Sequence, residues 1–125
     1  NLYKQRYSVT CANQVAFNGH LNVLQWLASP ERGTNIVYCS QLGASNAAKE
    51  GHFHIVKWLY SLSPPIIVLN GTINHIVLNG HFQIAEWLET EYGIKCTKRT
   101  LNMAFCNKNT VALKWLAKRY NMYKY

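Results

Sequence analysis

The sequence predicts an all-α protein built from about four helical hairpins of similar length. All four tryptophans, Trp26, Trp58, Trp87 and Trp115, are followed by leucine and recur at spacings of 32, 29 and 28 residues. Three of these Trp-Leu pairs end a nine-residue stretch that begins with Gly-His. Each stretch follows a segment with small or apolar residues at helical spacing, so a short helix and a longer helix repeat along the chain.

The first repeat, residues 9–33, shows the order expected of each hairpin. We predict its first helix over residues 9–18, with Thr10 as N-cap. The second helix follows over residues 20–29, and Pro30 ends it because proline cannot continue a helix interior.

The other repeats cover residues 41–64, 70–93 and 98–121 and follow the same scheme. A single hairpin of this length cannot bury both of its apolar sides, so we expect the hairpins to stack into one domain over residues 1–125. The connectors differ in length, and the composition of residues 31–41 allows a short extended segment.

The residue between the two helices of a hairpin, here called the junction residue, is glycine in three repeats. Glycine suits this place because a helix commonly ends on a left-handed residue. The fourth repeat has Lys108 there, flanked by Asn107 and Asn109. Asparagine tolerates the left-handed conformation next best, so we expect the fourth turn to be kept by an asparagine.

The net charge of +8 is concentrated in the last quarter of the chain. Basic and acidic residues balance through residue 92, whereas no acidic residue occurs from Gly93 on. Such asymmetry favours an acidic partner, although a solvated face of the last repeat has the same composition. The predicted basic patch consists of Lys95, Lys98, Arg99, Lys114, Lys118 and Arg119.

The sequence offers little for catalysis, metal binding or a cofactor, and we expect none of the three. The chain has no aspartate, no phosphate-binding glycine loop and no Gly-x-Ser-x-Gly. The junction histidines His20, His52 and His81 occupy equivalent places, so stacking puts them about 10 Å apart. Zinc ligands must lie within about 2.0–2.3 Å of one ion, so we expect these histidines to bond neighbouring backbone instead.

Two segments, Ala16 to Leu24 and Ala47 to Val56, resemble the ankyrin repeat with its Ala-Ala-x-x-Gly-His-Leu-x-Val-Val core. Tryptophan before leucine is similar to a divergent class of these repeats in giant DNA viruses and some protists. The resemblance covers residues 9–120 and implies an ankyrin-repeat solenoid. The family's Thr-Pro-Leu-His opening is absent, and asparagine replaces its histidine in three repeats, where we expect a local hydrogen bond. The family's aspartate-containing hairpin is also absent, so we expect short or irregular connecting fingers.

The resemblance further implies a non-catalytic scaffold that binds proteins through a concave face made by the first helices and connectors. The family's variable contact positions are the two residues before each junction residue. Here they are Phe17, Asn18, Lys49, Glu50, Leu78, Asn79, Cys106 and Asn107. The alternative is that Phe17 and Leu78 only cover a neighbouring helix or an adjoining repeat.

Two functions therefore remain. The first is a protein-interaction scaffold or adaptor, including a structural component of a larger viral assembly. The second is a nucleic-acid-associated module, in which the basic patch holds phosphates while Tyr120, Tyr123 and Tyr125 stack on bases.

We expect an intracellular protein, cytoplasmic or virion-associated and not secreted. The four cysteines lack the spacing of a disulfide framework, and no run of about 18 apolar residues could span a membrane. Solenoids need polar capping repeats, yet the fourth repeat is as apolar as the others. We therefore expect the chain to be a segment of a longer array, with further repeats or a partner covering its C-terminal end.

Overall fold

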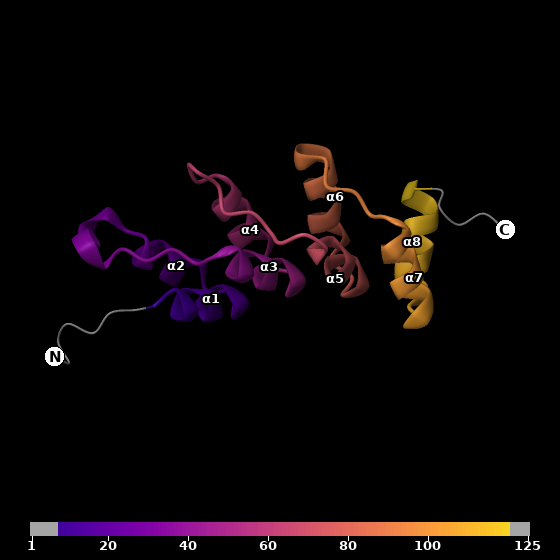
Figure 1. The fold of residues 1–125 in the computed structure, drawn as a ribbon, viewed down its shortest axis with the longest axis horizontal. Helices are drawn as coiled ribbons and strands as arrows, with labels where there is room; N and C mark the ends of the chain where they lie inside the picture. The colour runs from indigo at the N-terminus through magenta and orange to yellow at the C-terminus, as the bar shows by residue number, and fades with distance from the viewer. Residues whose placement is uncertain (1–7, 121–125) are drawn as a thin grey trace. The chain divides into compact units, whose positions relative to one another are not determined.

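The structure is a computed structural model that describes residues 8–120. These residues form eight α-helices and one 3₁₀ helix and contain no strand, so the prediction of an all-α protein is confirmed (Figure 1). The chain divides into two compact units, Asn1–Leu69 and Asn70–Tyr125. Each unit holds two of the four predicted repeats, and each is described by itself below.

The first unit contains two helical hairpins and a 3₁₀ helix between them. Its elements are α1 (Val9–Phe17), α2 (Leu21–Leu27), η2 (Pro30–Asn35), α3 (Gln41–Lys49) and α4 (Phe53–Tyr60). The short extended segment allowed within residues 31–41 is confined to their second half, because η2 ends at Asn35 and extended backbone begins at Ile36. Pro30 opens the 3₁₀ helix, where its fixed backbone angle fits and no donor is lost.

The second unit contains the third and fourth hairpins. Its helices are α5 (Thr72–Leu78), α6 (Phe82–Tyr92), α7 (Lys98–Cys106) and α8 (Thr110–Tyr120). An ion pair joins α8 to α6, since Arg119 Nη2 lies 2.7 Å from Glu89 Oε1.

Hydroxyl side chains begin three of the first helices. Ser8 accepts a hydrogen bond from the Cys11 amide at 3.1 Å, and Ser40 and Thr97 cap α3 and α7 in the same way. Each of these caps satisfies one of the amides that a helix start leaves without an intrahelical partner. The prediction of Thr10 as N-cap was wrong, because Ser8 caps α1 and Thr10 lies within the helix.

Small side chains on the first helices form one side of the core of the first unit. Ala12 and Ala16 of α1 are fully buried, as are Ala44, Ala47 and Ala48 of α3. Because these side chains are short, the two helices pack directly against each other.

The tryptophans are less buried than the leucines that follow them. Leu27, Leu59, Leu88 and Leu116 are all buried, whereas Trp26 is 52% exposed beneath the guanidinium of Arg32. Trp115 is only partly exposed because it stacks on Phe82 with the ring centroids 4.9 Å apart. The aliphatic residues thus make the core, and the tryptophans lie at its border.

In three repeats the polar residue six places before the junction residue makes a long-range hydrogen bond. In the first unit the Asn13 side-chain oxygen accepts from the Ser40 amide at 2.9 Å, and its NH₂ group donates to the Ser40 hydroxyl at 3.0 Å. The Ser45 hydroxyl accepts from the Leu69 amide at 2.7 Å. In the second unit Asn74 accepts from Thr100. The bond expected of asparagine here is therefore not local: it ties one hairpin to the next.

A second tie comes from the residue directly after the junction. His52 Nε2 lies 3.0 Å from the Phe17 carbonyl oxygen in the preceding hairpin. Asn109 occupies the equivalent place in the fourth repeat, and its side-chain NH₂ donates to the Leu78 carbonyl at 2.8 Å. The prediction of a histidine bonded to neighbouring backbone is confirmed for His52, and asparagine replaces the histidine in the fourth repeat.

The junction residues all have left-handed backbone. Gly19, Gly51 and Gly80 share φ near +83°, and Lys108 takes φ 52°. A side chain at Gly19 would also collide with the His52 ring, which comes within 2.6 Å of the place of a Cβ. The expectation that an asparagine keeps the fourth turn was wrong, because Lys108 itself adopts the strained conformation.

We expect Lys108→Gly to raise the free energy of unfolding by about 0.5–1 kcal/mol. Left-handed backbone costs a residue with a Cβ about 1–2 kcal/mol, and the greater freedom of unfolded glycine offsets part of this gain. Urea unfolding of both proteins measures the difference. Lys114→Gly is the matched control, because the same change inside α8 should cost about 1 kcal/mol. A lower free energy of unfolding in Lys108→Gly would contradict the inference that the backbone of Lys108 is strained.

Asn13→Ala should lower the free energy of unfolding by about 1–3 kcal/mol, because it leaves the part-buried Ser40 amide without its acceptor. Chemical denaturation followed by circular dichroism gives the value. Asn18→Ala removes an equal side chain from the exposed end of the same helix and should change stability by less than about 0.5 kcal/mol. Equal losses in the two variants would show that the hydrogen bonds between Asn13 and Ser40 add no stability of their own.

Candidate functional site

Each first helix buries one side and leaves another exposed. Positions nine, five and two places before the junction residue share the exposed side, since they are separated by four and then three residues. We call this set of positions the first-helix face. In the first unit it consists of Thr10, Gln14 and Phe17 on α1 and Leu42, Asn46 and Lys49 on α3.

A groove with a volume of about 340 Å³ runs along this face between α1 and α3. Its apolar residues are Phe17, which is 39% exposed, and Leu42, which is 50% exposed. The other residues that line it are Thr10, Asn13, Gln14 and Asn46. Side-chain amides both donate and accept hydrogen bonds, as a peptide group does, and no charged residue lines the groove. The groove can therefore contact an uncharged polypeptide segment.

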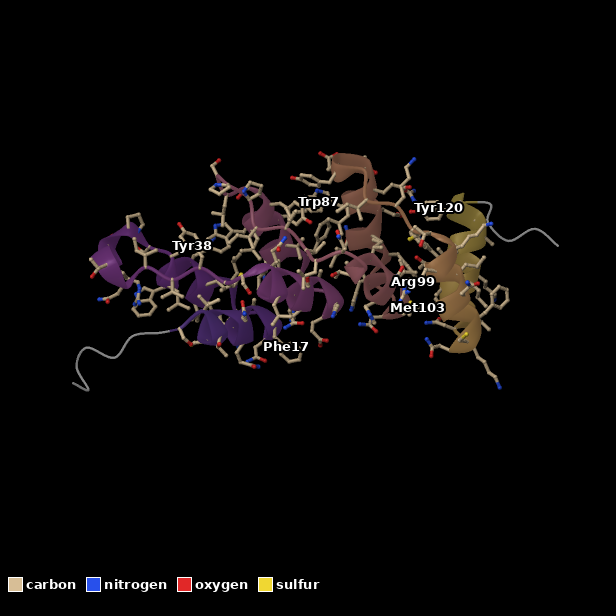
Figure 2. The ribbon with its side chains drawn as sticks, viewed as in Figure 1. Phe17, Tyr38, Trp87, Arg99, Met103 and Tyr120 are labelled. Carbon is tan, nitrogen blue, oxygen red and sulfur yellow. The ribbon has the colours of Figure 1, made fainter. Side chains whose placement is uncertain are left out.

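The equivalent positions of the second unit have different chemistry. His75 and Leu78 represent the first-helix face on α5, and Arg99, Met103 and Cys106 represent it on α7. His75, Arg99 and Cys106 are exposed, whereas Leu78 and Met103 are partly buried. Figure 2 shows Phe17 at the outer edge of the first unit and Arg99 and Met103 along α7.

The predicted contact residues lie at the C-terminal ends of α1, α3, α5 and α7. Each pair is the last helical residue and the C-cap that follows it. The C-caps Asn18, Glu50, Asn79 and Asn107 are all exposed. The first unit brings together the pairs of α1 and α3, and the second unit brings together those of α5 and α7.

The sequence analysis missed the earlier positions of the same face. Gln14 and Thr10 precede Phe17 by three and seven residues and share its side of α1, and both line the groove. The equivalent residues elsewhere are Leu42, Asn46, His75 and Met103, together with Arg99, which was predicted only as part of the basic patch. Counting back from each contact residue at helical spacing would have found them.

The alternative role for Phe17 and Leu78 was contact with a neighbouring repeat, and their main-chain groups do make such a contact. The carbonyl groups of both residues accept hydrogen bonds from the next hairpin. The Phe17 side chain nevertheless remains exposed and lines the groove. The two roles are compatible because one uses the main chain and the other the side chain.

The residues of the predicted basic patch lie in two places. One group lies just before and at the start of α7, and the other lies on α8. Lys95, Lys98 and Arg99 are exposed at the start of α7, whereas Lys114 and Lys118 lie one turn apart on the side of α8 away from its buried residues. The sixth residue, Arg119, bonds Glu89 through both Nε and Nη2. An acid within the same unit thus already engages this guanidinium.

The tyrosines predicted to stack on bases are differently placed. The Tyr120 ring meets Trp115 edge to face, with the centroids 5.7 Å apart, and its hydroxyl is buried beside Cys96. Burial raises the pKa of this hydroxyl well above its ordinary value. Tyr123 and Tyr125 lie outside the described residues.

Two cysteines are buried in the core and are poor nucleophiles. Burial raises the pKa of the Cys39 thiol to about 11, and burial also raises the pKa of Cys96. The thiolate is the reactive form, so little of it exists in either residue at neutral pH. All four cysteines have free thiols.

A polar hollow of about 380 Å³ lies at the starts of α2 and α4, where His20 and His54 line it. Within residues 8–120, no group of three or more His, Cys, Asp and Glu residues is arranged to hold a metal ion. Over the same range, no helix has the length and apolar composition needed to cross a membrane.

Comparisons of this chain with protein-family models, with curated proteins and with solved structures give no match. The likeness to ankyrin repeats therefore depends on residues of this chain alone. What can be concluded about its function must come from the two units described above.

Proposed function

We propose that this chain is a non-catalytic protein-interaction scaffold of ankyrin type, which binds partner proteins through its first-helix face. The observation that carries the proposal is the groove between α1 and α3, where exposed Phe17 and Leu42 lie among side-chain amides. Partly apolar surfaces with a few polar groups are typical of protein-binding sites.

The ties between hairpins support a scaffold role. In each unit they hold the two first helices side by side through the Asn13 or Asn74 side chain and through the carbonyl of Phe17 or Leu78. None of these groups is a side chain at the positions nine, five or two places before a junction residue. The residues on the face can therefore change from one hairpin to the next without loss of the fold. The pair formed by Leu42 and Arg99 is an example, since both stand nine places before a junction residue.

Nucleic-acid binding through the basic patch is less well supported. Arg119 is paired with Glu89, and the Tyr120 ring packs against Trp115. Binding of single strands commonly combines a cationic groove with exposed aromatic rings on which bases stack. Neither Arg119 nor Tyr120 is placed for such a role.

The test is co-purification of partners with the chain carrying Phe17→Glu and Leu78→Glu. A carboxylate at each place adds a charge to an apolar contact, so partner capture should fall by about tenfold or more while the helical circular dichroism stays unchanged. Quantitative mass spectrometry of the captured proteins measures the effect.

Val111→Glu is the matched control, because it places the same charge on an apolar side chain of α8 that is 62% exposed and lies outside the first-helix face. Partner capture should remain within about twofold of the unchanged chain, as is usual for surface changes away from a contact. Full retention of every partner by the double variant would remove the first-helix face from the proposal.

A further inference from the structure

The helices α5 and α7 of the second unit lie side by side and run in the same direction. Near their starts Thr100 donates a hydrogen bond to Asn74, and past their ends Asn109 donates to the Leu78 carbonyl. Two ties at matching ends fix the alignment of the helices. Residues on the exposed side of α5 therefore lie alongside the matching residues of α7.

The surface formed in this way, called the α5–α7 face, combines one cationic side chain, Arg99, with apolar ones. His75 and Leu78 come from α5, and Arg99, Met103 and Cys106 come from α7. Arg99 is exposed near the start of α7, and the half-buried Met103 follows it one turn further along the same helix. Leu78, at the end of α5, is also half-buried. Figure 2 shows Arg99 and Met103 on the side of α7 toward α5.

Arg99 stands where a cation is locally unfavourable. It is the second residue of α7, directly after Lys98, and the first turn of this helix contains no acidic residue. The positive end of the helix dipole disfavours a cation there. No acid follows Gly93 in the sequence, and Glu89 of α6 is bonded to Arg119. An external carboxylate would complement both the guanidinium and the helix terminus.

The apolar residues decide between the classes of acidic partner. A phosphate backbone is contacted by repeated cations and polar groups, whereas Leu78 and Met103 offer hydrocarbon and thioether surface. Methionine is flexible and polarisable and adapts to apolar side chains of different shape. A protein segment can supply both a carboxylate and an apolar side chain, and a nucleic acid backbone supplies only the negative charge.

We propose that the α5–α7 face binds an acidic protein segment, with a carboxylate on Arg99 and an apolar side chain against Leu78 and Met103. This inference rests on the proposed scaffold function and specifies the chemistry of one part of the partner. The groove between α1 and α3 is uncharged and binds a different, neutral part. The two units thus differ in the partner chemistry that they select.

Fluorescence anisotropy with a short labelled peptide of Glu and Leu residues tests the proposal on the full chain. The peptide should bind, and its analogue with Gln in place of Glu should bind about tenfold or more weakly. Arg99→Gln should weaken binding of the Glu-Leu peptide by about tenfold, since a hydrogen bond between charged groups is lost. Met103→Gln should weaken it by about fivefold through lost apolar contact.

Lys118→Gln is the matched control, because it removes one cation from an exposed position of α8. Its affinity for the peptide should stay within about twofold of the unchanged chain. Equal loss in Lys118→Gln and Arg99→Gln would overturn the proposal, since it would show only general attraction to positive charge. Tighter binding of a single-stranded DNA oligonucleotide, or no binding of the peptide at all, would also overturn it.

Capture of natural partners by two variants distinguishes failure of this proposal from failure of the proposed scaffold function. If Phe17→Glu with Leu78→Glu abolishes capture of natural partners while Arg99→Gln leaves it unchanged, the scaffold function stands and the acidic segment is excluded. Loss of capture in Arg99→Gln, with Lys118→Gln unaffected, supports both. Capture that neither variant changes excludes both.

Discussion

The hydrogen bonds between consecutive hairpins are the constraint on which the rest of the structure depends. Each hairpin is too short to bury its apolar sides alone, so its position must be fixed by its neighbour. Bonds at the middle and at the end of α1, made by Asn13 and His52, fix the two hairpins of the first unit. Thr100 and Asn109 do the same for α5. Since these groups are polar and partly buried, their geometry permits only one alignment of the helices.

Alignment of the first helices determines which side chains can act together. Once α1 and α3 are fixed, residues at positions nine, five and two before the junction necessarily form one surface. The small side chains beneath it, such as Ala12 and Ala44, allow the helices to approach closely. The surface can then carry almost any chemistry, from the amides around Phe17 to the cation at Arg99.

The fourth hairpin shows that the tie matters more than the residue that makes it. Asn109 replaces histidine and reaches the equivalent carbonyl group, that of Leu78, and Lys108 replaces glycine at the cost of left-handed backbone. The turn and the tie are both preserved although neither Gly nor His is present. The requirement is thus geometric: a backbone in the left-handed region, followed by a donor that reaches the preceding hairpin.

The sequence by itself determined the helical hairpins and their number, because the recurrence of Gly-His and Trp-Leu marks the junctions and the apolar period marks the helices. It also located the ends of the first helices, where Phe17 and Leu78 lie. Only the tertiary structure decided that Asn13 bonds Ser40 rather than its own loop, and that Arg119 is engaged by Glu89. These pairs are separated by 27 and 30 residues, so no local pattern specifies them; they form only when the hairpins pack.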